Sequence, residues 1–169
     1  DIAYSYRTGN HGDGSWYSIN GNIDYQRTSR KNKQRMITFS YKINTQPQTS
    51  NSNTGYEDIH AKEEVDDLVK RLLLKNSQSD GKTNTMEQTF QVDYTTPIGE
   101  LHTVEAGAKY IFRRNTSDNK LYEAAGGSDD YLYNEDRSSD YRHLNHILAA
   151  YLGYTLKYKD FTFKPGVRY

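Results

Sequence analysis

Residues 86–113 alternate between apolar and polar side chains, and this pattern constrains the fold more than any other feature of the chain. Phe90 and Val92 occupy one parity of the first half, and Val104 and Phe112 occupy one parity of the second. A period of two residues is that of a β-strand. The intervening segment 95–99 contains proline and glycine, which favour tight turns and disfavour a central strand. The segment therefore predicts a β-hairpin.

The composition of the polar parity indicates what surrounds this hairpin. It carries carboxylates, amides, threonines and a glycine as well as cations, whereas the opposite parity carries aromatic and aliphatic side chains. A transmembrane β-barrel turns its apolar parity toward lipid and its polar parity toward an aqueous lumen. The hairpin is typical of such a wall.

The bulk properties exclude several classes of protein. The formal net charge is +0 and the pI is about 7.1, which argue against a nucleic-acid-binding protein. The chain contains no cysteine, so disulfide scaffolds and cysteine metal sites are excluded. No apolar run approaches the ~20 residues of a membrane-spanning helix, and no signal peptide opens the chain. Any membrane crossing must use strands, with which a mean hydropathy of -1.01 is compatible.

The remaining segments extend the same pattern. Alternation predicts further strands at 2–7, 17–26, 37–44, 145–157 and 161–169, although Ile147 and Tyr151 interrupt the pattern of the fourth. Gly-rich residues 9–14 are expected to form a loop, and 46–83 and 115–139 are expected to be long polar loops. We predict a single domain, 1–169, with an all-β, antiparallel, up-and-down sheet of about seven strands that is part of a larger transmembrane β-barrel.

Within the first long loop, residues 63–75 are expected to form a short amphipathic helix. Apolar residues recur there at helical spacing, acidic residues occupy the first turn and basic residues the end. The apolar stripe either docks a partner at the cell surface, such as a lipoprotein, or packs on its own loop. We favour packing on its own loop.

The connections and the aromatic residues indicate a bacterial outer membrane. The short links at 29–33, 95–99 and 158–160 alternate with longer ones, as in barrels with short periplasmic turns and long external loops. Tyr25, Tyr94 and Phe161 fall near the short-turn rim, and Tyr17 and Tyr110 near the other. Two aromatic girdles are thus expected at the membrane interfaces.

Several segments resemble the β-barrel of TonB-dependent receptors, especially the outer-membrane barrel family of Bacteroidetes-type bacteria. They are Asn22-Ile23-Asp24-Tyr25-Gln26, Asn76-Ser77 with Asp80-Gly81, Gln91-Val92-Asp93-Tyr94 with Pro97, Gly107-Ala108-Lys109-Tyr110 with Arg113, and Gly166-Val167-Arg168-Tyr169.

This resemblance implies import of a scarce solute across the outer membrane, driven by the TonB complex through a plug domain. The expected partners are outer-membrane lipid, the plug domain and TonB, a transported solute and a surface lipoprotein. The chain lacks a signal, a plug and a TonB box, and its strands are fewer than the ~22 of such barrels. We therefore expect a fragment of the barrel, whose open edges favour self-association when it is isolated.

The lumen-facing parity supplies the first candidate site. Its charged members could contact a plug or a passing solute, or they could pair with one another across neighbouring strands, which we favour. They are Asp24, Lys42, Asp93, Glu105, Lys109, Arg113, Lys164 and Arg168.

Other candidate sites are weaker. The acids Asp129, Asp130, Glu135, Asp136 and Asp140 could hold Ca²⁺, but they lack the spacing of an EF-hand, and a solvated acidic loop is favoured. His143 and His146 would lie on opposite faces of a strand, which argues against a shared metal ion. No nucleophile elbow, phosphate loop or zinc-protease motif occurs, so we expect no enzymatic activity, no cofactor and no metal.

The alternative hypothesis is a soluble all-β binding or structural module, in which the apolar parity faces a sandwich core. The two hypotheses differ in the environment of Tyr25, Phe90 and Leu152. These side chains are buried within one copy of a soluble module and exposed on a membrane barrel.

Overall fold

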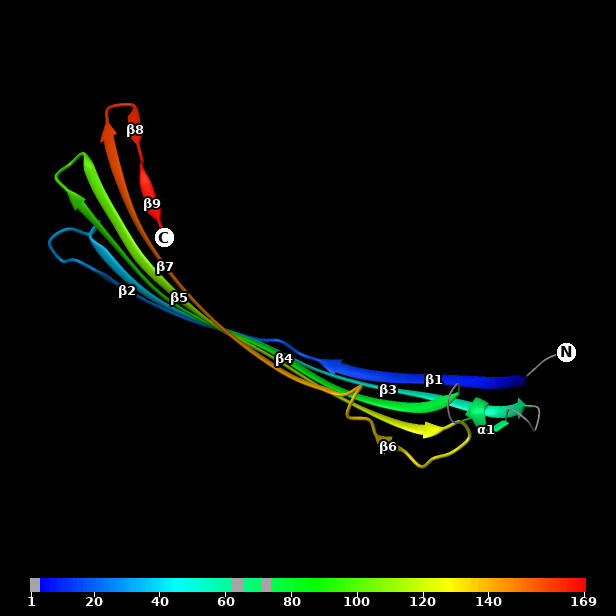
Figure 1. The fold of residues 1–169 in the computed structure, drawn as a ribbon. Helices are drawn as coiled ribbons and strands as arrows, with labels where there is room; N and C mark the ends of the chain where they lie inside the picture. The colour runs from blue at the N-terminus through cyan, green and yellow to red at the C-terminus, as the bar shows by residue number, and fades with distance from the viewer. Residues whose placement is uncertain (1–3, 62–65, 71–73) are drawn as a thin grey trace. The chain divides into compact units, whose positions relative to one another are not determined.

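The computed structural model describes residues 4–61, 66–70 and 74–169 and consists almost entirely of antiparallel β-structure (Figure 1). The elements are β1 Tyr4–Trp16, β2 Ile19–Thr28, β3 Met36–Ala61, α1 Asp66–Leu68, β4 Lys75–Ile98, β5 His102–Ala125, β6 Leu132–Tyr133, β7 Ser139–Tyr158, β8 Phe161–Phe163 and β9 Gly166–Arg168. The predicted all-β antiparallel fold is confirmed. Among the described residues, no helix is long and apolar enough to span a membrane.

The strands form one open sheet in the order β1-β3-β4-β5-β7-β8. β1 and β2 pair with different parts of β3, from Tyr4↔Ala61 to Trp16↔Gln48 and from Ile19↔Thr45 to Thr28↔Met36. β8 and β9 likewise pair with different parts of β7. The nine strands of the described residues therefore occupy six neighbouring positions. The sequence predicted about seven, because the first two predicted strands share one edge of β3.

One predicted loop is wrong and two others are wrong in part. Residues 9–14 continue β1, because their backbone pairs in register with residues 50–55 of β3. Most of 46–83 belongs to β3 and β4, and 115–125 belongs to β5. The polarity of these segments misled the prediction, since a strand exposed to water on both faces needs no apolar parity, and ladder hydrogen bonds alone fix its conformation.

The predicted helix is confirmed only in part. Asp66–Leu68 form α1, whereas 63–65 and 71–73 lie outside the described residues. Lys75, predicted to be helical, instead begins β4. The backbone N–H of Leu74 donates to the carbonyl of Val69 at 2.8 Å.

The chain divides into two compact units. The first contains Asp1–Tyr17, Gln46–Asn84 and Asn115–His143, and the second contains Ser18–Thr45, Thr85–Arg114 and Leu144–Tyr169. Among the described residues, the buried hydrophobic core is Val69, Leu74 and Ala124, all in the first unit.

Large apolar side chains of the second unit are exposed. Tyr25 is 58% exposed, Phe90 46% and Leu152 52%. These three positions were expected to separate a membrane barrel from a soluble module. Their exposure contradicts the soluble module, because within the described part of the chain no second sheet covers the apolar parity.

Candidate lumen-facing site

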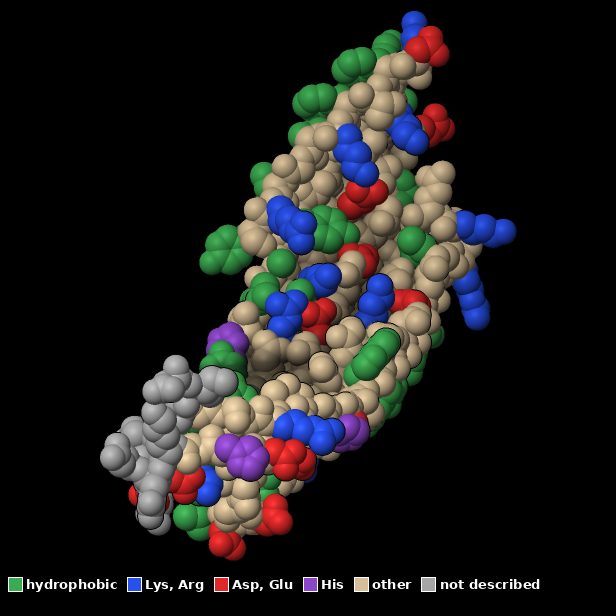
Figure 2. All heavy atoms as spheres, turned by 90° about the vertical axis from the view of Figure 1, so that its right-hand side faces the viewer, with side chains coloured by type: hydrophobic (Ala, Val, Ile, Leu, Met, Phe, Trp, Pro, Cys, Tyr) green, Lys and Arg blue, Asp and Glu red, His purple; other side chains and the backbone are tan. Residues whose placement is uncertain are grey.

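The second unit presents a polar face on which acidic and basic side chains alternate (Figure 2). β2, β3, β4, β5 and β7 each place every second side chain on this face, opposite the exposed apolar parity. A hollow of about 560 Å³ on this face is lined by amides, hydroxyls and charges. They include Asn20, Asn22, Asp24, Ser40, Lys42, Asn44, Glu87, Thr89, Gln91 and Lys109.

Two ion pairs cross the strands of this face. The Arg113 guanidinium on β5 donates to Glu87 Oε2 on β4, with Nε at 2.9 Å and Nη2 as a second donor. Lys164 Nζ, between β8 and β9, lies 2.8 Å from Glu105 Oε2 on β5. Gly153 of β7 lies beneath this second pair, since a Cβ there would be 3.6 Å from the same Glu105 oxygen. Charge pairing between strands is thus confirmed for Arg113, Glu105 and Lys164.

Asp93 takes part in a different arrangement. The Tyr151 hydroxyl on β7 donates to Asp93 Oδ1 at 2.7 Å, and Gln91 Nε2 donates to Asp93 Oδ2 at 2.8 Å. The tyrosine ring covers Gly107 of β5, where any Cβ would overlap the ring. An aromatic ring lying over a glycine of the neighbouring strand stabilises such a site in a barrel wall.

Three cations of the predicted set have no counter-ion at ion-pair distance within the part of the chain that the structure describes. Lys42 lies opposite Asn22 in the β2–β3 register and lines the large hollow together with Lys109. Lys109 also lines a second hollow of about 280 Å³ with Gln91, Tyr151 and Arg168. Asp24, which lines the same hollow, interacts electrostatically with Lys42, so Lys109 and Arg168 are the two cations of the set for which the described residues show no acidic partner.

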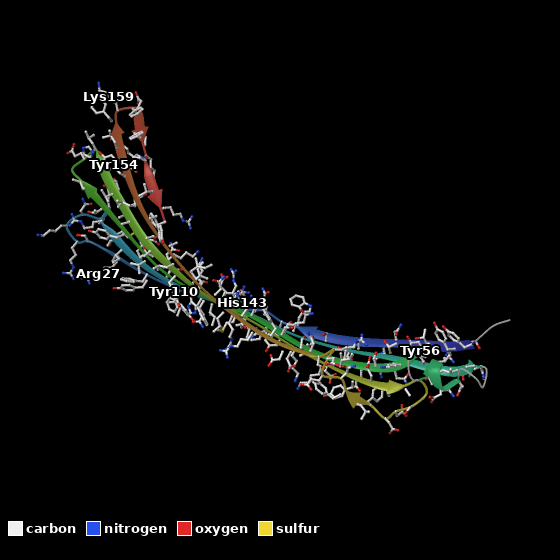
Figure 3. All side chains as sticks on the ribbon, in the orientation of Figure 1. Arg27, Tyr56, Tyr110, His143, Tyr154 and Lys159 are labelled. Carbon is white, nitrogen blue, oxygen red and sulfur yellow. The ribbon has the colours of Figure 1, made fainter. Side chains whose placement is uncertain are left out.

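Several polar groups of the opposite face are paired with one another. Tyr41 Oη donates to Gln88 Oε1 at 3.3 Å, and Tyr110 Oη lies 2.7 Å from His146 Nδ1. His102 Nδ1 lies 2.5 Å from Tyr154 Oη. Tyr110 and Tyr154 are labelled in Figure 3. Such pairing lowers the cost of placing polar atoms against hydrocarbon.

Residues 26–169 match the outer membrane protein beta-barrel family. The chain belongs to this family. No curated protein matches the chain. The match covers all strands of the second unit except the first part of β2.

The family places the protein in the bacterial outer membrane, as the aromatic and turn patterns predicted. The exposed apolar parity of the second unit then faces lipid, and the polar face is turned to the lumen. β3, β4, β5 and β7 have 26, 24, 24 and 20 residues, whereas about 9–11 residues of a tilted strand cross a bilayer. The parts of these strands that belong to the first unit lack the apolar parity.

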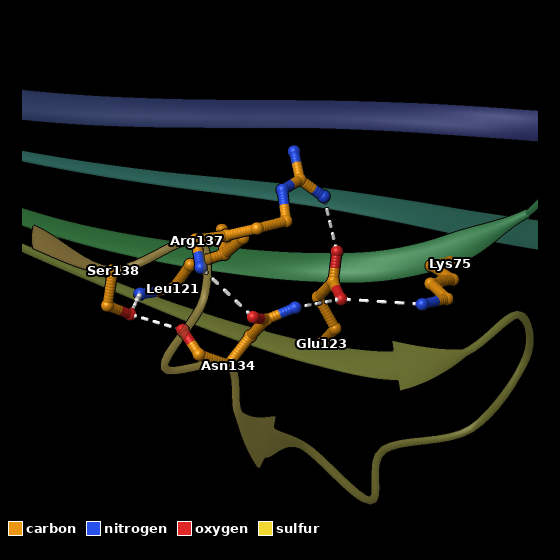
Figure 4. Close-up of polar contacts among 6 residues, drawn as sticks. All are labelled: Lys75, Leu121, Glu123, Asn134, Arg137 and Ser138. Atoms are coloured by element: carbon orange, nitrogen blue, oxygen red, sulfur yellow. Dashed lines mark hydrogen bonds and ion pairs between the residues drawn. The ribbon is translucent and has the colours of Figure 1, made fainter.

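The acidic loop of the first unit is built around Glu123, which sequence analysis did not single out (Figure 4). Asn134 Nδ2 donates to Glu123 Oε2 at 2.7 Å, and Arg137 Nη1 to Oε1 at 2.5 Å. Lys75 Nζ lies 3.5 Å from Oε2. The Asn134 amide first, and then the two cations, hold the pKa of Glu123 below its usual value, although burial opposes them.

Three further hydrogen bonds, two of them through the Ser138 hydroxyl, attach this loop to β5. Asn134 N–H donates to Leu121 O at 2.8 Å, Leu121 N–H to Ser138 Oγ at 2.9 Å, and Ser138 Oγ to Asn134 O at 2.6 Å.

The described residues contain no group of three or more acidic or histidine side chains placed to hold a metal ion. The Ca²⁺ candidates Asp129, Asp130, Glu135, Asp136 and Asp140 are therefore not brought together as a site. His143 and His146 both lie on β7, where a spacing of three puts them on opposite faces. His146 contacts Tyr110 and Phe112, and His143 stacks on Tyr141.

Asn76, in one of the segments that carry the family resemblance, has a structural role in the first unit. It is 6% exposed, its Oδ1 accepts from Tyr56 N–H at 2.8 Å, and its Nδ2 donates to Ser128 O at 3.0 Å. Gly81 of the same segment lies against Ser50 and Asn119, at 2.6 and 2.9 Å from an added Cβ. These contacts connect β3, β4 and β5 within the first unit.

The apolar stripe of the predicted helix is described at one side chain, Val69, which is 1% exposed within the first unit. The backbone N–H of Gly126 donates to Lys70 O at 2.9 Å, so the helical turn is attached to the end of β5. At Val69, packing on its own unit is thus observed.

Proposed function

We propose that this protein forms part of the barrel of a TonB-dependent receptor, which imports a solute across the outer membrane. A plug domain inside the barrel and the inner-membrane TonB complex would drive this import. The observation that carries the proposal is the polar face of the second unit, with its ion pairs, its hollows and the cations Lys109 and Arg168, which make no ion pair among the described residues. A barrel wall of this composition suits a lumen that holds a plug and passes a polar solute.

Family membership and the segments that resemble TonB-dependent receptors support this proposal. The open sheet also supports a larger barrel, since bacterial single-chain barrels contain even strand numbers from eight upward. Six neighbouring strand positions leave both edges in need of partners. We propose that further strands of the same barrel occupy both edges.

Basic side chains along the hollows favour a solute that carries negative charge. Lys42, Lys109 and Arg168 line the hollows, and a carboxylate or phosphate passing them would gain charge-assisted hydrogen bonds. The double variant Lys109→Gln and Arg168→Gln should slow uptake of anionic solutes and leave neutral ones unchanged. Lys31→Gln with Lys33→Gln, in the β2–β3 turn, is the charge-matched control.

The test of the proposed function uses the intact protein purified from outer membranes. It should co-purify with the isolated periplasmic domain of TonB and show little steady conductance in planar bilayers, because a plug fills the lumen. A protein that ignores TonB and conducts ions continuously would instead be a passive channel, and the proposal would be wrong.

A further inference from the structure

The turn between β2 and β3 concentrates basic residues at one rim of the second unit. Five lysines and arginines occur between residues 27 and 35, with no acidic residue: Arg27, Arg30, Lys31, Lys33 and Arg35. Backbone hydrogen bonds order the turn, from Ser29 N–H to Arg35 O at 2.9 Å and from Arg35 N–H to Asn32 O at 3.0 Å. The arginines are therefore presented by a defined backbone.

The strand register places Arg27 on the lipid-facing side. Tyr25 pairs with Phe39, and two residues further on Arg27 pairs with Ile37. Tyr25 and Phe39 are exposed and their ring centroids lie 6.4 Å apart, on the apolar parity. Because side chains two apart share a face, Arg27 follows directly after this aromatic pair. Figure 3 shows Arg27 at the turn end of the strands.

Arg35 lies on the same side. Its Nε donates to Thr96 Oγ1 of β4 at 3.1 Å. Tyr94, two residues before Thr96 on the same face of β4, lines the same groove as Arg35. A groove of about 430 Å³ is lined by Arg27, Arg30 and Arg35 together with Met36, Ile37 and Tyr94. The groove thus has cationic groups and an apolar wall.

No carboxylate neutralises these arginines among the residues that the structure describes, because Arg27, Arg30 and Arg35 make no ion pair there. Three like charges in one groove repel one another, and a bound anion would remove that repulsion. A guanidinium matches a phosphate with two parallel hydrogen bonds, better than an ammonium does. A ligand that fits this groove would carry a phosphate attached to an apolar chain and would lie at the membrane interface.

We propose that this groove binds the phosphate headgroup of an anionic glycerophospholipid of the periplasmic leaflet, with an acyl chain along Ile37 and Tyr94. The short-turn rim of a bacterial barrel faces the periplasm, which selects this leaflet. Basic residues beside a bilayer surface attract anionic lipids in this way. The site depends on insertion in the outer membrane and not on the proposed transport.

The test measures lipid retention by the intact protein in detergent micelles. Protein exchanged into detergent with equal phosphatidylglycerol and phosphatidylcholine should retain phosphatidylglycerol preferentially in native mass spectra. Arg27→Gln with Arg35→Gln should reduce that preference roughly tenfold. Lys31→Gln with Lys33→Gln removes the same charge outside the groove lining and should leave most of the preference. Heat-modifiable migration in gels confirms that each variant is folded.

Further arms separate the sources of the phosphate. The variant Arg27→Lys with Arg35→Lys keeps both positive charges and should fold. Its retention of phosphatidylglycerol should be intermediate, because lysine cannot make the bidentate contacts of arginine. Inorganic phosphate should not displace the lipid, since it lacks the apolar chain. Displacement by phosphate, preference for lipopolysaccharide, or equal losses in the two glutamine variants would each overturn the proposal.

Discussion

Tyr151 on β7 donates a 2.7 Å hydrogen bond to Asp93 on β4, and its ring crosses the intervening strand at Gly107. Three neighbouring strands are therefore locked by one tyrosine on the polar face. The glycine is required because the ring occupies the space of a Cβ. This arrangement makes the stability of the wall depend on a residue with no side chain.

Gly107→Ala should destabilise the protein. The new Cβ would lie 2.6 Å from Asp93 Oδ1 and closer still to the Tyr151 ring, so the ring must move. Overpacking of this kind costs about 1–3 kcal/mol, which urea unfolding in detergent would measure. Gly153→Ala is the matched control, because its Cβ would meet Glu105 Oε2 at an ordinary 3.6 Å. Equal unfolding midpoints would refute the proposed locking role.

A cation on the lipid-facing parity should hinder membrane folding. Phe90 is 46% exposed on that face, and Phe90→Arg should cost about 2–4 kcal/mol if it lies near the bilayer midplane. Gln91→Arg, one residue further, points to the lumen beside Asp93 and should cost little. The folded fraction in lipid vesicles measures both. If Gln91→Arg lowers the folded fraction as much as Phe90→Arg does, the assignment of the two faces is incorrect.

Acid should release the loop that Glu123 holds. Its pKa is lowered in the folded protein, so its contribution to stability is complete above the unfolded-state value of 4.5 and is lost as pH falls through the lower folded pKa. The protection factors of residues 126–138, which correct hydrogen exchange for its intrinsic pH dependence, should therefore fall as the pH drops below 4.5. Glu123→Gln should show fast exchange already at pH 7. Asp129→Asn, in the same loop, should keep the wild-type profile.

Asn76→Ala should loosen the first unit without affecting the second. Loss of the amide leaves Tyr56 N–H without its side-chain acceptor and frees Ser128 O, a cost of about 1–3 kcal/mol for a buried donor. Limited proteolysis should cut residues 126–138 faster. Asn51→Ala provides the comparison, since Asn51 is exposed and its contact with Asp13 is 3.4 Å long. If Asn76→Ala is cut no faster than the wild type, the two Asn76 hydrogen bonds do not hold residues 126–138 in place.

The sequence by itself determined the fold class, the two faces and the membrane. Alternation in 86–113 identified the hairpin that became the ends of β4 and β5, because a period of two follows directly from strand geometry. The exposure of Tyr25 and Phe90 was expected for the same reason. Pairing of Arg113 and Lys164 with acids of neighbouring strands was also expected as a class of contact, although the pattern did not specify which acid pairs with which cation.

Only the tertiary structure decided how far the strands run and which residues organise the polar face. Segments 9–14 and 46–61 carry no apolar parity, so their strand structure depends on ladder hydrogen bonds between residues distant in sequence. Tyr151 is an exception to the alternation of its strand. Its position on the polar face is explained by Gly107 of β5 and Asp93 of β4, which strand pairing places beside it. Glu123 likewise gained its role from Lys75, Asn134 and Arg137. A local pattern reports which face a side chain takes, whereas its partners depend on strand order and register, which the pattern does not contain.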